Sequence, residues 1–191
     1  MNSGGSPGFP VRTALREATD EVHRRLHGVP PFQAIADGRL ALADYAALLG
    51  RIHAFHLLIE QACGAALSGL LPSRRIALLE ADLSALGAAP APPPSWHPPR
   101  GEAAALGALY VAQGSIMGGK LIHRQLDYLF GKAEAGRTYF RGSRDDALRW
   151  RMLCLRLEQD GAAPDALPAM IAGAQGAFAL FGRCIEEPLL A

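Results

Sequence analysis

One stretch near the middle of the chain places residues that a helix disfavours inside a strongly helical pattern. Gln113 to Lys120 reads QGSIMGGK and lies within a long apolar segment of helical period. Each interior glycine costs a helix roughly 1 kcal/mol relative to alanine, so Gly114, Gly118 and Gly119 together cost about 3 kcal/mol. A chain that keeps them needs bare backbone there, either for a kink or for the close approach of a flat group.

A histidine on the first predicted helix could ligate a metal or have a structural role. Leu15, Ala18, Val22 and Leu26 recur at steps of three and four residues, and His23 lies on the shoulder of that apolar stripe. Imidazole is a common metal ligand, but a helical histidine in such a place is more often half-exposed or hydrogen-bonded. Position alone therefore favours a structural His23, with a ligand role as the alternative.

A second set of candidate ligands lies on the helix predicted to begin near Leu42. His53, His56 and Glu60 follow one another at steps of three and four, so one helix could offer two imidazoles and a carboxylate to a metal. A di-iron bundle needs a second, matching set of carboxylates, and the sequence contains no Glu-x-x-His motif. A structural role is favoured for these residues, and a metal site is the alternative.

Length and composition predict one all-α domain. The chain has 191 residues, half of them hydrophobic and 19% charged, which suffices for one well-buried core and is short for two. Helical periodicities outnumber alternating segments. We expect a disordered tail over residues 1–10 and a single domain, a multi-helix bundle, over residues 11–191.

Capping and breaking residues divide that domain into helices. We expect helices over Thr13 to His27, Pro31 to Asp37, Leu42 to Ala66, Pro72 to Leu86, Glu102 to Phe130, from Ser143 onward, and Asp165 to Glu186. Six prolines between residues 88 and 101 predict a surface crossover, which Trp96 pins to the core.

The helix expected after Ser143 has a clear beginning. Asp145 and Asp146 in its first turn suit the positive end of a helix dipole. Its periodicity predicts an inward-facing side that carries Leu148, Arg151, Met152 and Leu155.

Charge and cysteine content exclude several classes of protein. A net charge of +1 without a concentrated basic stripe argues against a nucleic-acid surface. The N-terminal MNSGGSPGFP lacks the apolar region of a signal peptide, and glycines and polar residues break the longest uncharged run, residues 103–119, so neither export nor a membrane span is expected. Cys63, Cys154 and Cys184 suit reduced core thiols in a cytoplasmic protein.

Two segments of the chain resemble motifs of the heme oxygenase family. LREATDEVHRRLH, residues 15–27, resembles the proximal helix of that family, and LYVAQGSIMGGKLIHRQL, residues 109–126, is similar to its distal helix, especially in the bacterial branch that produces biliverdin. Weaker landmarks lie at Tyr45, Leu48-Leu49, Phe55-His56, Glu60, Asp82-Leu83, Leu86-Gly87, Ala177-Phe178 and Phe181. The resemblance covers nearly the whole chain from residue 15 onward and implies a heme oxygenase-like bundle with a kinked, glycine-rich distal helix.

The resemblance implies that heme lies between these two helices. His23 would be the axial ligand of the heme iron. Gly114, Gly118 and Gly119 would bring bare backbone against the other heme face, which supplies the flat group that the glycines call for. In the mammalian branch an aspartate follows the first distal glycine and organises the water network that delivers protons. Ser115 stands at that position here, and a hydroxyl can still donate and accept hydrogen bonds through water.

The remaining site residues follow from the same resemblance. Leu109 and Met117 would line the heme cleft. Arg16 lies two helical turns before His23 on the same side, and Arg151 is the best match on the helix that follows the glycine-rich one. Each arginine can hold a propionate with two parallel hydrogen bonds, which fixes the rotation of the heme about the iron axis.

The implied activity uses heme as both cofactor and substrate. A meso carbon of heme is hydroxylated with O2, and the ring opens to biliverdin with release of CO and ferrous iron. Electrons would come from an external reductase or ferredoxin, since the sequence carries no nucleotide or flavin fingerprint. We expect a cytoplasmic monomer, with a dimer as the alternative.

Two other functions stay open on the sequence alone. The first is a non-catalytic heme-binding or heme-carrying protein of the same fold, in which Ser115 marks altered proton delivery. The second is a helical bundle that binds another small molecule, or a non-heme metal through His53, His56 and Glu60.

Overall fold

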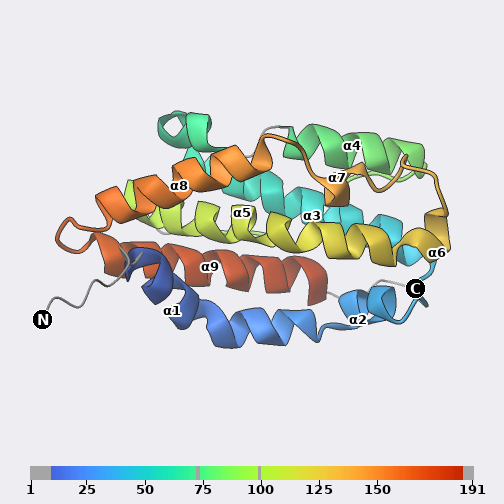
Figure 1. Cartoon of the computed structure of the whole chain (residues 1–191), viewed down its shortest axis with the longest axis horizontal. Helices are drawn as coiled ribbons and strands as arrows, with labels where there is room; N and C mark the ends of the chain where they lie inside the picture. Colours follow the sequence, from blue (N-terminus) through green and yellow to red (C-terminus); the bar gives the residue numbers. More distant parts are fainter. Residues whose placement is uncertain (1–9, 72–73, 99, 187–191) are drawn as a thin grey trace, which may run out of the picture.

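The computed structural model describes residues 10–71, 74–98 and 100–186, and within these ranges it contains helices and no strands. The elements are α1 (Pro10–His27), α2 (Pro30–Ala36), α3 (Leu42–Cys63), the 3-10 helix η1 (Ala65–Leu70), α4 (Arg75–Ala85), α5 (Glu102–Gln125), α6 (Asp127–Phe130), α7 (Thr138–Arg141), α8 (Asp146–Asp160) and α9 (Ala166–Glu186). Figure 1 shows α3, α5 and α9 as long central helices, with α1 and α2 on one side and α4, α7 and α8 on the other.

The predicted all-α fold is confirmed. The ends of α3 and α9 agree with prediction to within a few residues, and α5 runs as helix through all its glycines. Neither η1 nor α7 was predicted. The predicted tail lies outside the described residues except for Pro10, which begins α1, and the predicted start of the third long helix at Pro72 also lies outside them.

The two central helices α5 and α9 touch backbone to backbone at one crossing. A Cβ atom added at Gly107 would lie 1.8 Å from the carbonyl oxygen of Met170, and one added at Gly173 would lie 1.9 Å from that of Ala104. No side chain fits at such distances, so glycine is required at both positions. The crossing fixes α5 and α9 relative to each other in the centre of the core.

The start of α1 is capped by a residue from the far end of the chain. The Glu158 carboxylate of α8 accepts hydrogen bonds from the backbone N–H groups of Val11 and Arg12, at 3.1 and 3.0 Å. This negative group lies where the helix dipole and the unpaired N–H groups favour it. The predicted start of this helix at Thr13 is therefore wrong, because α1 begins three residues earlier, at Pro10.

Helix α8 presents a different face to the core from the one predicted. Leu148, Met152 and Leu155 are 51%, 43% and 65% exposed, while Leu153 and Leu157 are fully buried. The predicted inward-facing side is wrong for these three residues and for Arg151, which is also exposed. Apolar residues occur on both sides of this helix, so its periodicity alone does not decide which side packs.

The unpredicted helix α7 is held by buried charged side chains of α4. Asp82 is 1% exposed and accepts hydrogen bonds from the backbone N–H of Thr138 and Tyr139 at 2.9 and 2.7 Å. Arg75, also buried, donates to the Tyr139 carbonyl at 2.9 Å and pairs with Asp146 at the start of α8. The first two residues of this four-residue helix are thereby fixed to the core, and a helix this short has little stability by itself.

The proline segment and the cysteines behave as predicted. The backbone N–H of Ala91 donates to the carbonyl of Gly50 on α3 at 3.2 Å, and Trp96 packs partly buried on the core. All three cysteines are free and buried, and burial raises the pKa of Cys63 to about 12, so its thiol stays protonated.

One helix of the described chain, α3, is long and apolar enough to cross a membrane by length and composition alone. Of its most apolar window, 61% is buried inside the protein, and α3 packs against α4, α5 and α9. These properties are those of a core helix, for which an apolar sequence on all sides is expected.

The glycine crossing gives a test within a single helix. Gly107→Ala forces α5 and α9 apart, so we expect it to lower the free energy of unfolding by about 3 kcal/mol. Gly118→Ala is the matched control, because a Cβ there meets nothing within 4 Å and alanine favours a helix by up to about 1 kcal/mol. Urea denaturation of both variants measures the difference; equal stabilities would contradict the close crossing.

Candidate functional site

The three glycines of the predicted distal helix, Gly114, Gly118 and Gly119, have three different surroundings in α5. A Cβ at Gly118 would meet nothing within 4 Å, one at Gly114 would lie 3.8 Å from the Trp150 ring of α8, and one at Gly119 would lie 2.9 Å from the Phe140 carbonyl of α7. Only Gly118 therefore borders open space. Gly119 is required by the close approach of α7, and Gly114 lies in ordinary contact with an aromatic ring.

The open space at Gly118 follows from the geometry of α5 and α9. Gly118 lies eleven residues after Gly107, which is about three helical turns and about 16 Å along the same face of α5. The two helices run in the same direction and cross at Gly107. At Gly107 this face is covered by the α9 backbone, and three turns later it is exposed.

His23 is exposed on α1 and lies against the central helix α9. Its ring meets that of Phe178 on α9 edge to face, with ring centroids 6.0 Å apart. Helix α9 packs on both α1 and α5, so the helix that carries His23 and the helix that carries Gly118 share one neighbour (Figure 1). An exposed imidazole can serve as a ligand to a group that comes from solution.

The two arginines predicted to bind the heme propionates, Arg16 and Arg151, lie near the contact between α1 and α8. Arg16 is exposed and close enough to Tyr110 of α5 to lower the pKa of that phenol, against the larger raising effect of burial. Arg151 is exposed and lies two turns before Glu158, hence on the side of α8 that reaches α1. Among the described residues neither arginine forms an ion pair with a carboxylate, unlike Arg75.

Of the two predicted cleft-lining residues, Leu109 lies in the core. It is 0% exposed and comes nine residues before Gly118, which is two and a half turns and therefore the opposite face of α5. This position favours a packing role over contact with a ligand at Gly118. The side chain of Met117 lies outside what the structure describes.

Ser115 borders a small cavity behind the glycine-rich face. Its hydroxyl donates to the Ala112 carbonyl at 2.8 Å. The cavity, of about 50 Å3, has three polar residues in its wall, Ser115, Arg75 and Tyr139. The Nε–H of Arg75 has no hydrogen-bond partner among the described residues. The space suits one or two water molecules, because an orphaned donor and two hydroxyls can bind them. The apolar residues of the wall are Phe32, Ile52, Ile116, Ile122, Phe140 and Phe181.

Two buried aromatic groups behind this cavity are joined by a hydrogen bond. His56 Nε2 and the Tyr139 hydroxyl are 2.8 Å apart. Burial, with smaller contributions from Arg75 and His53, lowers the pKa of His56 to about 3, and burial raises the pKa of Tyr139 to about 12. Both side chains are therefore neutral at physiological pH.

Sequence reasoning did not identify Arg75 or Tyr139 as members of the site. Arg75 lies at the start of α4 and Tyr139 in the unpredicted α7, and neither position forms a local pattern with the distal glycines. Their burial, 2% and 6% exposed, comes from contacts between segments more than sixty residues apart. A single sequence offers no signal for such contacts.

The alternative metal site on α3 is not supported. In the part of the chain that the structure describes, no three His, Cys, Asp or Glu side chains are grouped to hold a metal. His56 bonds Tyr139, and His53 Nε2 lies 3.7 Å from a carboxylate oxygen of Glu80 on α4. The sequence preference for structural roles of these histidines agrees with this arrangement.

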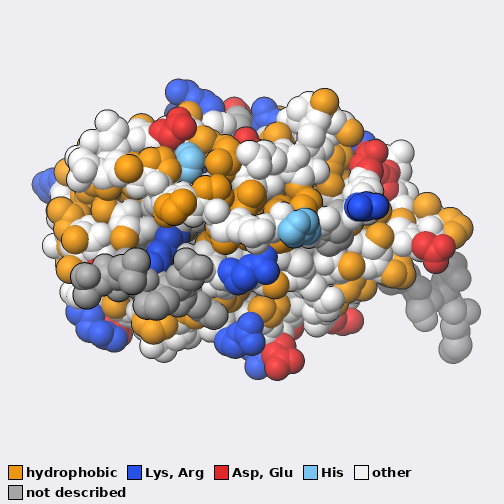
Figure 2. Space-filling model, turned by 180° about the vertical axis from the view of Figure 1, so that it is seen from behind, with side chains coloured by type: hydrophobic (Ala, Val, Ile, Leu, Met, Phe, Trp, Pro, Cys, Tyr) orange, Lys and Arg blue, Asp and Glu red, His pale blue; other side chains and the backbone are white. Residues whose placement is uncertain are grey.

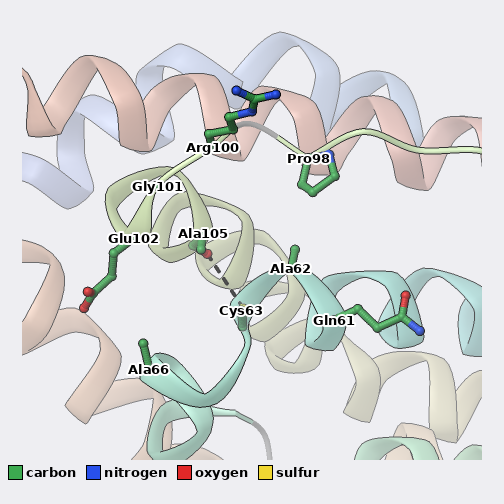
Figure 3. A pocket seen from close by; sticks show the side chains of 9 residues that line it. All are labelled: Gln61, Ala62, Cys63, Ala66, Pro98, Arg100, Gly101, Glu102 and Ala105. Atoms are coloured by element: carbon green, nitrogen blue, oxygen red, sulfur yellow. Dashed lines mark hydrogen bonds between the residues drawn. The ribbon is translucent and has the colours of Figure 1, made fainter.

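A larger surface hollow lies at the other end of α5. Figure 3 shows its lining, in which the Cys63 thiol donates to the Ala105 carbonyl and the Arg100 side chain points away from the other polar groups. Its volume is about 410 Å3. Ala105 precedes Gly114 by nine residues, about 13 Å along the helix, so this hollow is separate from the candidate site.

On the face visible in Figure 2, Lys and Arg side chains do not form a continuous stripe. On that face, Lys and Arg side chains alternate with hydrophobic and acidic ones.

The low pKa of His56 makes stability depend on pH. The unfolded chain protonates this histidine below about pH 6.5, whereas the folded protein does so only near pH 3, so stability falls as the pH drops through this window. When the pH falls from about 7 to about 5, His56 should lower the free energy of unfolding of the wild type by about 2 kcal/mol. The His56→Gln variant has no titrating group at this position. Its free energy of unfolding, measured by urea denaturation at the two pH values, should therefore fall by about 2 kcal/mol less than that of the wild type. Parallel losses in both proteins would contradict the assignment.

A bacterial enzyme is similar to this chain over most of its length. The heme oxygenase of Xanthomonas campestris pv. campestris (strain 8004) is 34% identical over 161 residues, which cover 80% of this chain and 95% of the relative. A scan against models of protein families gives no match.

Two solved structures share the fold. The NO- and CO-bound heme oxygenase of Neisseria meningitidis matches with a TM-score of 0.74 and 23% identity, over 97% of this chain and 96% of that one. The heme oxygenase of Leptospira interrogans matches with a TM-score of 0.71 and 17% identity, over 93% and 99%. The resemblance noted in the sequence and the predicted fold class are thus confirmed, and the chain belongs to the heme oxygenase family.

Proposed function

We propose that this heme oxygenase binds heme between α1 and α5 and opens its ring to biliverdin, with release of CO and ferrous iron. The observation that carries the proposal is that an exposed histidine and an uncovered glycine lie on two helices that both pack on α9. Heme brings the redox chemistry of iron and is also the molecule that is oxidised, with O2 as the oxidant. The protein supplies binding, orientation and protons.

His23 is the proposed axial ligand. Its exposed imidazole can bind iron through a neutral ring nitrogen. The Phe178 ring that contacts its edge restricts the orientation of the imidazole. A ligand whose ring orientation is fixed by its neighbours loses less entropy when it binds.

The bare backbone at Gly118 is the proposed wall on the opposite heme face. Because a Cβ at this position would point into open space, any larger side chain would occupy volume that the heme and O2 need. Gly114 and Gly119 support this wall, since Trp150 and the Phe140 carbonyl lie against them.

Arg16 and Arg151 are the proposed partners of the heme propionates. Helices α1 and α8 contact each other where the Glu158 carboxylate accepts a hydrogen bond from the N–H group of Arg12. The two helices are antiparallel (Figure 1). Arg16 follows this contact in the sequence and Arg151 precedes it, so in an antiparallel pair both arginines lie on the same side of the contact. Two exposed guanidinium groups then flank one end of the site, where carboxylates can bind them bidentately.

Ser115 is the proposed hydrogen-bonding residue beside the reacting ligand. It is exposed and lies within one turn of Gly118 on the open side of α5, with the small cavity behind it. Water in that cavity would connect its hydroxyl to Arg75 and Tyr139. Electrons would come from an external ferredoxin or reductase in the cytoplasm, with the protein acting as a monomer or dimer.

Purified protein with heme, ascorbate or ferredoxin plus reductase, and air tests the proposed reaction. We expect the heme absorption to decay and a biliverdin band to replace it, because each step of ring opening needs only O2, electrons and protons. A heme spectrum that persists under these conditions would support the non-catalytic carrier instead.

The ligand assignment is tested by substitution of His23. His23→Ala should shift the heme Soret band and change the spin state, because the axial nitrogen is lost. His97→Ala is the matched control, since His97 is an exposed histidine on the proline segment, outside both α1 and α5. Unchanged spectra in His23→Ala would show that another residue binds the iron.

The open face of α5 is tested by adding volume to it. Gly118→Leu should lower heme affinity or turnover by about tenfold or more, as expected when about 1.4 kcal/mol of binding is lost, with little change in helix content by circular dichroism. Lys120→Leu adds the same side chain to an exposed position of the same helix on another side and should behave as wild type. Normal turnover in Gly118→Leu would refute the close approach of heme to α5.

A further inference from the structure

We propose that the outer face of α8 docks reversibly on the surface of an anionic phospholipid bilayer, beside the entrance of the heme site. The docking stripe is formed by Leu148, Met152 and Leu155. The purpose assigned to it, uptake of heme from the bilayer, rests on the proposed function, whereas the docking itself does not depend on heme.

The docking stripe is apolar and exposed, although the opposite side of the same helix is well packed. Its three residues are 51%, 43% and 65% exposed, whereas Leu153 and Leu157 are fully buried. At 3.6 residues per turn, the three exposed side chains project within about 60° of one another, so they form one line along the helix axis. Helix α8 packs against α1, α5 and η1 through its other sides (Figure 1).

Arginines border the docking stripe along both of its edges. Their helical positions place Arg144 and Arg151 on the edge nearer to α1, and Arg149 and Arg156 on the other edge. A narrow apolar line with cationic edges is typical of a helix that lies in the surface of an anionic membrane. The apolar side chains enter the boundary of the acyl chains, and the guanidinium groups reach the phosphates.

The charge of this face is positive, because most of the carboxylates on α8 are engaged elsewhere. Asp146 pairs with the buried guanidinium of Arg75, Glu158 caps α1, and Asp160 pairs with one of the bordering arginines. Among the described residues, the other three bordering arginines form no ion pair, and Asp145 is the remaining exposed carboxylate of the helix start. The face therefore attracts anions.

The size and charge of the docking stripe fit a lipid surface better than a second copy of the chain. The exposed parts of three side chains amount to a few hundred Å2, whereas a stable protein interface buries about 800 Å2 on each partner. In a pair of copies packed stripe on stripe, the bordering arginines would lie against each other and repel. A bilayer adapts to a narrow stripe, and its phosphates attract every bordering cation.

The docking stripe lies beside the entrance through which heme would reach its site. Arg151 belongs to the edge of the stripe and to the proposed propionate site, and Arg16 lies on the neighbouring helix α1. Heme is a flat amphiphile whose ring dissolves in lipid while its two carboxylates stay among the headgroups. Docking through α8 would place both guanidinium groups at the level of those carboxylates, and this favours a bilayer over a soluble acidic protein as the occupant.

The first test measures binding of the heme-free protein to vesicles by co-sedimentation. The protein should bind vesicles of phosphatidylcholine with phosphatidylglycerol, and high salt should release it, whereas vesicles of phosphatidylcholine alone should bind little. Leu155→Glu should weaken binding at least about tenfold, because it removes an apolar contact and adds a repelled charge. Arg144→Gln should weaken it about fivefold, as expected from about 1 kcal/mol for each cation near an anionic surface.

Leu42→Glu is the matched control for Leu155→Glu. It makes the same substitution at a leucine that is 48% exposed at the start of α3, so it should bind vesicles as the wild type does. Both leucines are exposed, so neither substitution disturbs the core, and urea denaturation should give both variants the stability of the wild type.

The second test compares heme supplied in phosphatidylglycerol vesicles with heme supplied in solution. The wild type should take up heme from the vesicles faster than Leu155→Glu, in proportion to their vesicle binding. Both proteins should bind dissolved heme equally, because Leu155 is no part of the proposed site. Equal rates of uptake from vesicles would overturn the role of the docking stripe in heme uptake.

The remaining outcomes separate this inference from its rivals and from the proposed function. A wild type that does not bind the anionic vesicles, or a Leu155→Glu variant that binds them as Leu42→Glu does, would overturn the docking. A wild-type dimer that Leu155→Glu dissociates, or slower reduction of that variant by an acidic ferredoxin, without vesicle binding in either case, would overturn it in favour of a protein occupant. Vesicle binding by a protein that takes up no heme from any source would leave the docking in place while the proposed function fails.

Discussion

The close crossing of α5 and α9 is the constraint on which the rest of the site depends. Gly107 and Gly173 let the two backbones touch, and the carbonyls of Met170 and Ala104 leave no room for a side chain there. Because α9 also carries Phe178, which contacts His23, this single crossing fixes the position of His23 on α1 relative to the glycine-rich helix α5. Helices that touch at one point must diverge away from it, and Gly118, three turns along the same face, lies where α5 is no longer covered.

Helix α7 imposes a second constraint, on the far side of α5. Its Phe140 carbonyl lies against Gly119, and its Tyr139 ring forms part of the wall behind Ser115. A four-residue helix has little stability of its own, so this placement depends on the buried side chains of Asp82 and Arg75. The glycine-rich stretch therefore has a backbone carbonyl against one side, at Gly119, and open space on the other, at Gly118.

Much of the fold could be predicted from the sequence, because helix periods and breaking residues are local signals. The long helices, the proline crossover and the two motif helices follow from them. The association of His23 with the distal glycines came from the family resemblance instead, and it stays a prediction. Long-range pairs left no such signal. The cap that Glu158 provides for α1, the face of α8 that packs, and the separate surroundings of Gly118 and Gly119 all depend on segments far apart in the chain.

The buried polar groups around α7 are the part of the core that hydrophobic packing does not explain. Burying the Arg75–Asp146 pair and Asp82 costs desolvation energy, which apolar side chains of similar size would avoid. What such groups provide is direction, because a hydrogen bond fixes an atom where a methyl group only fills space. Here the fixed atoms are the backbone N–H and carbonyl of Tyr139, and the carbonyl of the next residue, Phe140, lies against Gly119. Apolar side chains would fill the same space, but they would leave these backbone groups of α7 without hydrogen-bond partners.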